Sequence, residues 1–471
     1  MSRKHCNRWL LIVVLALMLG ACIPYSFSPP KEIHINPEDT VVAAKVAVDA
    51  QGYSHIVGGE SHRIVYYRTH YGEPIITLTF TMSPPGTIYH PDIAVTDNGI
   101  AYLVWVESYG GSSEKFACWQ KIPFFKPPGE EWPNYCEPLD EVDIQTTGNV
   151  RVVARGNKAY AVYDRMYTGD SNGRIGELMY KELTNPSITG HVHWYTEYFE
   201  TGFIYSLDLG IDSQGYMHVG FHDNYTYTGS PPFTERISLH SNASVESGHD
   251  MAQHWFIVTG TGLDEEVPVS LSFHLDSADV ERVALASVSQ NTPTRDLIFI
   301  DSCVANGCAD QNSYLVMLPS SWSTYSMINE VEILGIEQTL YLSFTGYNSV
   351  DPHQVYFMDA YSWSPPTNIS QTDDTLKFTL EMTKVDGRDP SFPVTFPAIA
   401  WMESDLTSKT NYFVFDGLSN KIKVFDKYCD EFSPMADISS NGIYFSGVWD
   451  TCYNTWFSTQ AWTNQLPLII K

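Results

Sequence analysis

A glycine that is followed eight residues later by an acidic residue recurs along this chain, each time within the same local pattern. An apolar segment leads into a tight turn that ends in glycine, and a second apolar segment then ends on the acid. The five copies pair Gly52 with Glu60, Gly99 with Glu107, Gly156 with Asp164, Gly215 with Asp223, and Gly442 with Asp450. Because glycine tolerates the positive φ of a tight turn, each copy predicts two β-strands joined by a hairpin.

Three weaker copies of the second strand lie between the others, at residues 283–287, 339–344 and 397–401. The last of them is followed by Glu403, whereas Val288 and Gly346 stand where the other two would carry an acid. Eight copies over residues 52–442 give a spacing of about 56 residues, close to the period of four-stranded propeller blades. Seven blades are the alternative, because the copy around residues 271–289 is the poorest.

The composition of the strands predicts a closed, all-β fold. Most second strands are apolar or small at nearly every position, so both of their faces must be covered, as they are when each blade packs between two neighbours. An aromatic-rich third strand usually follows, and no segment shows sustained 3.6-residue periodicity. The last unit stops after three strands, and residues 32–35 can supply its outer strand. The sequence therefore predicts a single β-propeller over residues 32–471, with eight four-stranded blades and an N-terminal strand that closes the ring.

With this repeat, the body resembles the sialidase-like and related repeat propellers of secreted bacterial proteins. The resemblance covers about residues 32–465 and concerns architecture only. Sialidases carry Asp-box copies and an Arg-Ile-Pro motif, whereas this chain has no Asp-box and its nearest match to the second motif is Arg63-Ile64-Val65. No catalytic residue is carried over, and the catalytic residues stay unknown. Glycoside hydrolysis is therefore an activity that the resemblance implies and that no motif of this chain supports.

Residues 1–22 predict export and a lipid anchor. Three basic residues among the first eight precede an eleven-residue apolar run, which is too short to span a bilayer. The run ends in Leu19-Gly20-Ala21-Cys22, which resembles the lipobox of bacterial lipoproteins. The resemblance implies that residues 1–21 are a cleaved signal peptide, that Cys22 carries the lipid, and that residues 22–31 form a tether. Ile23 in place of Asp implies the outer membrane, if the cell has one.

The charge of the chain limits its partners. Acidic residues number 55 and basic residues 27, which gives a net charge of −28, and cleavage of the signal peptide makes it about −31. Nucleic acid is excluded as a partner because a protein this acidic is repelled by polyanions. The lipid is the predicted link to the membrane, and the protein is expected to be a monomer.

Six cysteines remain in the mature chain besides Cys22, and an even number outside the cytoplasm favours disulfides. Fifteen connectivities are open in principle, but the cysteines fall into three pairs that are local in sequence. The predicted bridges are Cys118–Cys136, Cys303–Cys308 and Cys429–Cys452. Zinc bound by Cys303 and Cys308 is the alternative for that pair.

The acids that end the second strands predict one carboxylate-lined face, because these strand ends lie opposite the first hairpin turns of a propeller. The candidate ligand-binding residues are Glu60, Glu107, Asp164, Asp223, Glu403 and Asp450. Such a face favours cations or sugar hydroxyls. The structural alternative is that each acid caps loop amides at a strand end. Neighbouring aromatic residues, which could stack on a ligand or pack within the blades, are Trp105, Tyr163, Phe221, Trp401 and Trp449.

Other polar groups give weaker hypotheses. Arg165 and Arg236 could hold an anionic substrate or form surface salt bridges. Histidines that could bind zinc are His191 with His193, and His240, His249 and His254 with Glu246 and Asp250 in one polar segment. Neither group has a third ligand at a fixed spacing. No nucleophile elbow, phosphate-binding loop or zinc-protease motif is present. No cofactor is predicted, and structural calcium is left open.

Two functions from different classes remain. The first is a non-catalytic recognition or scaffold module for a glycan, peptide or protein partner, with a role in envelope assembly as a variant of it. The second is a glycoside hydrolase or lyase that acts on extracellular carbohydrate. To choose between them, the most direct observation is whether two carboxylates and an arginine converge in a pocket of the central channel.

Overall fold

The computed structural model describes residues 31–461 except for short segments. Outside the description are residues 1–30, 34–40, 61, 71–72, 82–85, 110–114, 127–131, 133–135, 141–148, 169–173, 195–203, 226–233, 246–250, 262–267, 292–293, 304–311, 316–326, 348–352, 363–364, 371–375, 387–394, 405–408, 416–420, 429–434, 441–443, 452–453 and 462–471. The predicted lipobox lies there, as do the side chains of Cys303, Cys308, Cys429 and Cys452.

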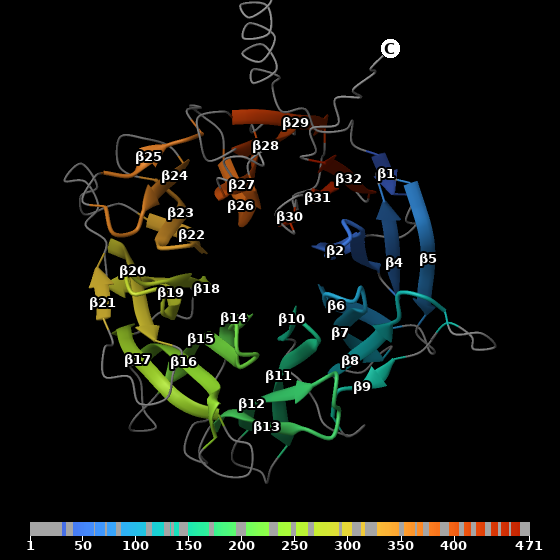
Figure 1. The fold of residues 1–471 in the computed structure, drawn as a ribbon, viewed down its shortest axis with the longest axis horizontal. Helices are drawn as coiled ribbons and strands as arrows, with labels where there is room; N and C mark the ends of the chain where they lie inside the picture. The colour runs from blue at the N-terminus through green and yellow to red at the C-terminus, as the bar shows by residue number, and fades with distance from the viewer. Residues whose placement is uncertain are drawn as a thin grey trace, which may run out of the picture.

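Within the described residues the chain is all β, with eight four-stranded antiparallel sheets and no helix. The sheets surround a common centre, and in each of them the first strand along the chain is innermost, except that the last sheet takes its outer strand from the N-terminus (Figure 1). This arrangement is a β-propeller, as predicted.

From the inside outward, each of the first four sheets is built from four strands that follow one another along the chain. They are β2 Val41–Val48, β3 Ser54–Glu60, β4 Arg63–His70 and β5 Glu73–Thr81; β6 Gly86–Val95, β7 Ala101–Tyr109, β8 Lys115–Ile122 and β9 Glu137–Pro138; β10 Val150–Arg155, β11 Lys158–Thr168, β12 Arg174–Glu182 and β13 Thr189–Trp194; and β14 Ile204–Ile211, β15 Met217–Tyr225, β16 Thr234–Val245 and β17 Met251–Thr261.

The strands of the other four sheets follow in the same order. They are β18 Val269–Leu275, β19 Glu281–Asn291, β20 Thr294–Cys303 and β21 Asn312–Leu315; β22 Met327–Ile336, β23 Thr339–Tyr347, β24 Gln354–Asp359 and β25 Thr367–Asn368; β26 Leu376–Asp386, β27 Thr395–Ser404, β28 Lys409–Phe415 and β29 Lys421–Tyr428; and β30 Met435–Ser440, β31 Tyr444–Thr451, β32 Asn454–Ala461 and β1 Lys31–Ile33.

The first and last strands of the chain share one sheet. β1 pairs antiparallel with β32, with Lys31 opposite Phe457 and Ile33 opposite Thr455. All three weaker copies of the repeat are second strands, at β19, β23 and β27. The recurring pattern therefore marks equivalent positions in successive sheets.

The repeated glycines lie in the turns that join first and second strands. Gly52, Gly99, Gly156 and Gly215 all have a positive φ, between 61° and 88°. Gly442 lies outside the described residues. A side chain larger than hydrogen is unfavourable in this backbone region, which explains why the register depends on glycine.

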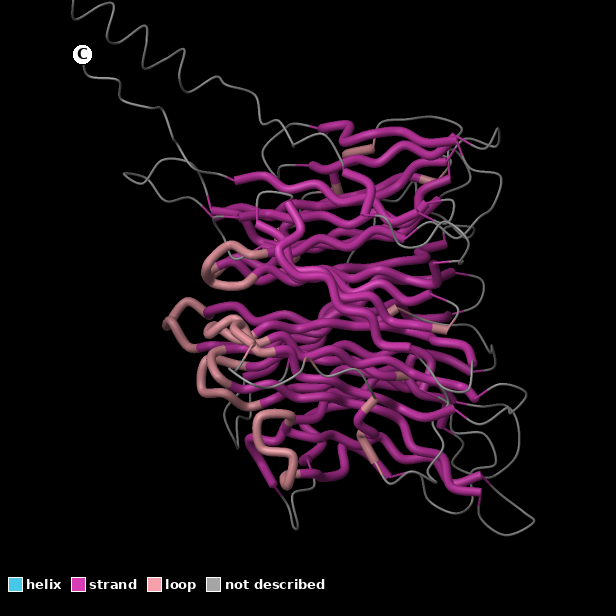
Figure 2. The backbone as a smooth tube through the Cα atoms, turned by 90° about the vertical axis from the view of Figure 1, so that its right-hand side faces the viewer, coloured by secondary structure: helices cyan, strands magenta, loops and turns pink. Residues whose placement is uncertain are grey.

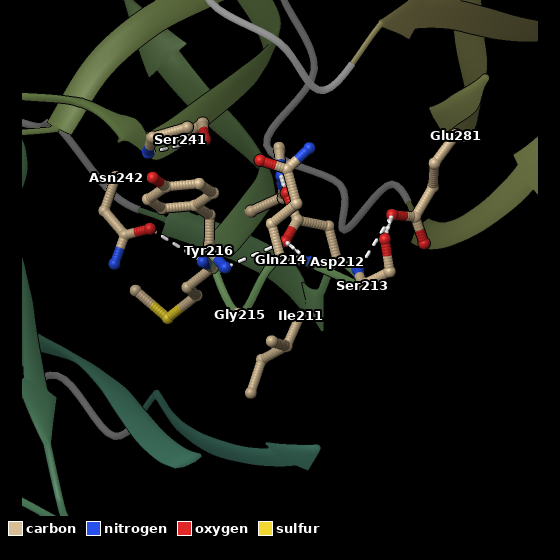
Figure 3. Close-up of polar contacts among 12 residues, drawn as sticks. Ile211, Asp212, Ser213, Gln214, Gly215, Tyr216, Ser241, Asn242 and Glu281 are labelled. Atoms are coloured by element: carbon tan, nitrogen blue, oxygen red, sulfur yellow. Dashed lines mark hydrogen bonds and ion pairs between the residues drawn. The ribbon is translucent and has the colours of Figure 1, made fainter. Parts of the chain in front are cut away.

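Two of these turns share the sequence Asp-x-Gln-Gly-Tyr-x-His and the same hydrogen bonds. Asp212 Oδ1 accepts from the backbone N–H groups of Gln214 and Tyr216, and its Oδ2 lies 3.2 Å from Nε2 of His218 (Figure 3). Asp49 makes the equivalent contacts in its own turn. The aspartate thus fixes the turn by accepting two amides, while the buried histidine holds its second oxygen.

Both faces of a second strand pack against neighbouring blades. Along β11, Ala161 and Tyr163 belong to the apolar cluster shared with β7, whereas Tyr160 and Val162 belong to the cluster shared with β15. The nearly continuous apolar sequence of these strands is therefore explained by burial on two sides.

Inner strands of neighbouring blades are linked by polar side chains. Oδ2 of Asp208 in β14 accepts from the N–H of Leu271 in β18 at 2.6 Å, and Asp92 in β6 accepts from Val152 in β10 at 2.9 Å. Ser272, Glu330 and Ser439 accept backbone amides of the next inner strand in the same way. These bonds satisfy amides that face a neighbouring blade rather than a partner strand.

No helix in the described part of the chain is both long and apolar enough to cross a membrane.

Candidate functional site

The two ends of the ring are named here by the connections that they carry. The turn face holds the connections from first to second and from third to fourth strands, and the far face holds the connections from second to third strands and between blades. The predicted acids end the second strands, so they lie at the far face, as expected.

Two of these acids are held by a tryptophan two residues earlier. Trp105 Nε1 donates to Glu107 Oε1 at 2.8 Å, and Trp401 Nε1 donates to Glu403 Oε1 at 2.9 Å. Glu403 is 2% exposed and also binds Nζ of Lys421 at 2.7 Å. Burial raises the pKa of Glu107, and the indole hydrogen bond opposes that rise.

Asp164 has the contacts of a structural cap. Its Oδ1 accepts from the backbone N–H of Asn149 at 3.1 Å, and its own N–H donates to the carbonyl of Asn149. The side chains of Glu60, Asp223 and Asp450 lie outside the described residues. Among the three described acids, Asp164 accepts a loop amide, as the capping alternative predicts, whereas Glu107 and Glu403 accept from side chains. Ligand binding by the six acids stays a prediction.

The other candidate residues whose side chains are described are buried or paired with a charged group. Four aromatic residues beside the acids are fully buried within blades, namely Trp105, Tyr163, Phe221 and Trp401. Arg165 Nε lies 3.1 Å from Asp140 Oδ2, so it forms an ion pair. The side chains of Arg236, His193 and Trp449 lie outside the described residues.

The predicted histidine groups are arranged by strand pairing. His191 lies on β13 with Nδ1 3.7 Å from Glu177 Oε2. His240 and His254 lie on the paired strands β16 and β17, where Gln253 stands opposite His240. Glu246, His249 and Asp250 lie outside the described residues, so the second zinc hypothesis is not tested there.

The bridge between Cys118 and Cys136 is present, as predicted from their spacing. Glu107 lies beside it, and ligand atoms of the three residues fall within 4.8 Å of one another. This group is not a metal site, because both sulfur atoms are bonded to each other and neither is a free thiolate.

A cavity of about 550 Å³ opens at the turn face, at the end of the central channel. Six inner strands or their turns contribute to it. Its polar lining includes Arg155, Ser213, Ser272, His274, Glu281, Glu337, Thr383, Lys384 and Ser440, and its apolar lining includes Phe273, Leu275, Leu334 and Met382. The cavity is therefore built by the ring as a whole and belongs to no single blade.

Part of the charge in this cavity is neutralised by protein contacts. Glu281 Oε2 accepts from the backbone N–H of Ser213 at 2.7 Å and from its hydroxyl, as Figure 3 shows, and Glu281 Oε1 lies 3.3 Å from Arg155 Nη1. The side chains of Lys384 and Glu337 have no hydrogen bond or ion pair within the described part of the chain. One ammonium and one carboxylate therefore remain available to a ligand.

Among the charged residues of the inner strands, five interact with one another in the central channel: Lys45, Arg151, Asp208, Glu332 and Glu381. Lys45 Nζ and Glu381 Oε1 form an ion pair at 3.0 Å. Ser270, two residues before the cavity-lining Ser272 on β18, donates to Glu332 at 3.0 Å. The carboxylates thus lie one layer deeper than the cavity.

Burial raises the pKa of Asp208 to about 6, against the hydrogen bonds from Leu271 and Leu209 and the positive charge of Arg151. The pKa of Glu332 is also raised well above its ordinary value, first by burial and then by the negative charges of Glu381 and Asp208. Asp208 and Glu332 therefore bind protons more readily than they would in water.

Sequence reasoning missed the channel charges, although a signal was present. In β14 the residues Ser206, Asp208 and Gly210 alternate with larger apolar ones, which is the pattern of a strand with one face toward water. In β2, Lys45 is the one charged residue of an apolar strand. Both charged residues lie in the middle of first strands, whereas the predicted acids lie at the ends of second strands.

Comparisons with known proteins find only distant similarity. No protein-family model and no curated protein matches the chain. Among solved structures, it is similar to a Dyadobacter fermentans protein of unknown function (TM-score 0.34, 11% identity, covering 70% of this chain and 96% of that one). It is also similar to a Penicillium chrysogenum alpha-L-arabinanase complexed with arabinobiose (0.36, 8%, 80% and 93%) and to a Trypanosoma rangeli sialidase (0.40, 9%, 93% and 59%). Likenesses of this size carry no information about the chemistry of this chain.

Proposed function

We propose that this protein is an exported, lipid-anchored, eight-bladed β-propeller that recognises a glycan without catalysing a reaction. Cys22 carries the lipid, and β1 closes the ring by completing the sheet of β30, β31 and β32. The eight described sheets and the pairing of β1 with β32 support this architecture. Cleavage and acylation at Cys22 would place the protein in the cell envelope.

The cavity at the turn face is the observation that carries the proposal. Its volume of about 550 Å³ suits a small ligand such as one or two sugar rings. His274 contacts Asp301 and a backbone carbonyl, and Glu281 is held by Ser213 and Arg155. The groups left open are the ammonium of Lys384, which can donate to sugar hydroxyls, and the carboxylate of Glu337, which can accept from them. They do not form an acid–base pair of two carboxyl groups.

An aromatic ring beside the cavity favours a glycan over a peptide. Tyr361 is half-exposed, its hydroxyl donates to Asp301 at 2.6 Å, and its ring centroid lies 6.1 Å from that of the cavity-lining His274. A ring fixed in this way offers a flat apolar surface next to polar groups, which suits the face of a sugar.

A glycan array probed with the purified mature protein tests this function. In Lys384→Ala and in Glu337→Gln, the affinity for a captured glycan should fall about tenfold, the effect of losing one hydrogen bond to a charged group. Glu107→Gln, at the far face, is the matched control and should retain capture. Loss of capture in Glu107→Gln with full capture in Lys384→Ala would place the ligand at the far face and refute the cavity.

A second candidate function, glycoside hydrolysis, is supported by the channel carboxylates. Asp208, with a pKa of about 6, could serve as a proton donor near neutral pH, and Glu381, 3.0 Å from Lys45, could serve as the second carboxyl group that such a mechanism needs. Arg151 adds the positive charge that an anionic substrate would need. Turnover of fluorogenic glycosides that is lost in both Asp208→Asn and Glu381→Gln would favour the enzyme. Absence of turnover across a broad panel would leave recognition as the function.

A further inference from the structure

Two turns between first and second strands carry an acidic residue where the strong copies of the repeat carry glycine. Glu337 is the first residue after β22, as Gly156 is the first residue after β10, and its φ is 50°. The N–H of Asp279 donates to the carbonyl three residues earlier, as that of Gly215 does, and its φ is 58°. Both turns belong to the turn face, the edge of the ring where Figure 2 shows most of the described loops. Each acid therefore holds a strained backbone conformation that glycine would adopt without strain.

The side chains of these two acids differ in their contacts. Asp279 Oδ1 accepts from Nε2 of Gln338 at 2.9 Å, which joins the two turns. The backbone carbonyl of Glu337 accepts from the N–H of Leu275 at 2.7 Å, so its turn is fixed against β18. The Glu337 carboxylate itself lines the cavity and makes no hydrogen bond or ion pair with a described residue. A strained residue whose side chain adds no such contact to the fold indicates a use for that side chain in binding.

The opposite charge comes from the next inner strand. Lys384 belongs to β26, which packs against β22, and its side chain lines the same cavity as Glu337. The two charged groups do not form an ion pair with each other, whereas Glu281 and Arg155 in this cavity do, at 3.3 Å. The cavity therefore presents a carboxylate and an ammonium separately, and each can bind a ligand group of the opposite charge.

We propose that the cavity recognises a zwitterionic sugar, with the ammonium group of the sugar on Glu337 and its carboxylate on Lys384. This inference rests on the glycan recognition proposed above and names the class of sugar. A neutral sugar would leave both protein charges to water, and a sugar with one charge would use only one of them. Leu334 and Met382 line the cavity from the same two strands and offer apolar surface to the ring carbons.

Titration with small sugars, followed by saturation-transfer NMR, tests this preference. Muramic acid carries an amine and a carboxyl group on one sugar, and at about pH 6 both are charged. N-acetylmuramic acid keeps only the negative charge, and glucosamine keeps only the positive one. Muramic acid should bind about tenfold more tightly than either, the effect of one additional charged hydrogen bond. Equal binding of the three sugars would overturn the proposal.

Two further results separate this proposal from glycan recognition itself. Triglycine is a zwitterion without a sugar ring, and it should bind at least tenfold more weakly than muramic acid. Triglycine binding as tight as that of muramic acid would overturn the assignment to sugars. Absence of muramic acid binding by a protein that captures another glycan would refute the zwitterion and retain glycan recognition. Absence of binding to every glycan would refute both.

Variants of the two strained acids locate the site. Glu337→Gly should abolish the preference for muramic acid over N-acetylmuramic acid, and its midpoint of thermal unfolding should not fall, because glycine relieves the strain. Asp279→Gly is the matched control, with the same change at an acid outside the cavity lining, and should retain the preference. Lys384→Gln should abolish the preference over glucosamine. A lower midpoint in Glu337→Gly with the preference intact would assign the carboxylate to the fold and overturn the proposal.

Discussion

At the scale of single residues, the channel is lined by carboxyl groups that serve as acceptors between blades. Asp208 accepts two backbone amides, one from its own strand and one from β18. A residue in this position links two blades and also responds to pH, because burial raises its pKa from an ordinary value of 3.8 to about 6. The Asp208 carboxyl group therefore both joins two blades and makes the stability of the protein depend on pH.

The raised pKa of Asp208 predicts a dependence of stability on pH. The folded state holds the proton more tightly than the unfolded state, so the stabilisation is fully present below pH 3.8 and is lost as pH rises through about 6. This loss amounts to about 3 kcal/mol in the free energy of unfolding. In Asp208→Asn this contribution should disappear, measured by urea denaturation at several pH values between 4 and 7.

A channel residue that does not titrate provides the control for that series. Thr383→Val should change the free energy of unfolding by the same amount at every pH. If the free energy of unfolding of Asp208→Asn changed with pH as it does in the parent protein, Asp208 would not be the group that causes the pH dependence.

The two Trp-x-Glu pairs predict unequal costs for the same substitution. Glu107 has one described partner, the indole of Trp105, whereas Glu403 also binds Lys421. A glutamine oxygen can still accept from the indole, so Glu107→Gln should cost less than about 1 kcal/mol. Glu403→Gln also removes the negative charge that balances the Lys421 ammonium, so it should cost about 2 kcal/mol or more. Chemical denaturation of both variants measures the difference, and equal losses would contradict this account.

At the scale of elements, the inner strands of adjacent blades approach each other closely. A Cβ atom at Gly335 in β22 would lie 1.9 Å from the backbone oxygen of Phe273 in β18, whereas one at Gly59 would meet side-chain atoms alone, the nearest being those of Pro91 at 3.2 Å. The atom that an added Cβ at Gly335 would meet belongs to the backbone of β18, so a change of side-chain rotamer cannot relieve the clash.

This close approach predicts a specific cost for one methyl group. Gly335→Ala should lower the free energy of unfolding by about 3 kcal/mol, because β18 and β22 must separate to admit the Cβ atom. Gly59→Ala, the matched control, should cost clearly less, since Pro91 can shift. Thermal unfolding monitored by near-ultraviolet circular dichroism measures both, and a Gly335→Ala protein as stable as the control would rule out the close packing of these strands.

The strands and turns could be predicted from sequence where a local pattern repeats. The charged residues of the channel could not be predicted in this way. Glycine at a positive φ and an apolar second strand recur in the four strong copies whose turns the structure describes, so the hairpins of Gly52, Gly99, Gly156 and Gly215 follow from sequence. The bridge between Cys118 and Cys136 follows from local spacing. The contact between Glu332 and Ser270 joins residues that are 62 positions apart, and no local pattern encodes such a distance.

At the scale of the whole molecule, the ring depends on one short strand. β1 contributes three residues to the outer edge of the last sheet, where they pair with Thr455, Trp456 and Phe457. Because β30 packs against both β26 and β2, any loosening of the last sheet is passed to the first and seventh blades. The same strand is next to the proposed tether, so the proposed ring closure and the proposed membrane attachment involve neighbouring residues.

Removal of β1 should therefore open the ring at this sheet. Two unacylated chains are compared, one beginning at Pro30, which keeps β1, and one beginning at Val41, which lacks it. Three strand pairs at about 1 kcal/mol each predict that the shorter chain is less stable by about 3 kcal/mol. Limited proteolysis should then cut it first within residues 435–461, since those strands lose their outer partner, and addition of a peptide of residues 23–40 should restore resistance. Equal stability and an unchanged cleavage pattern would mean that the last sheet holds together with three strands and that β1 serves only to lead the chain toward the membrane.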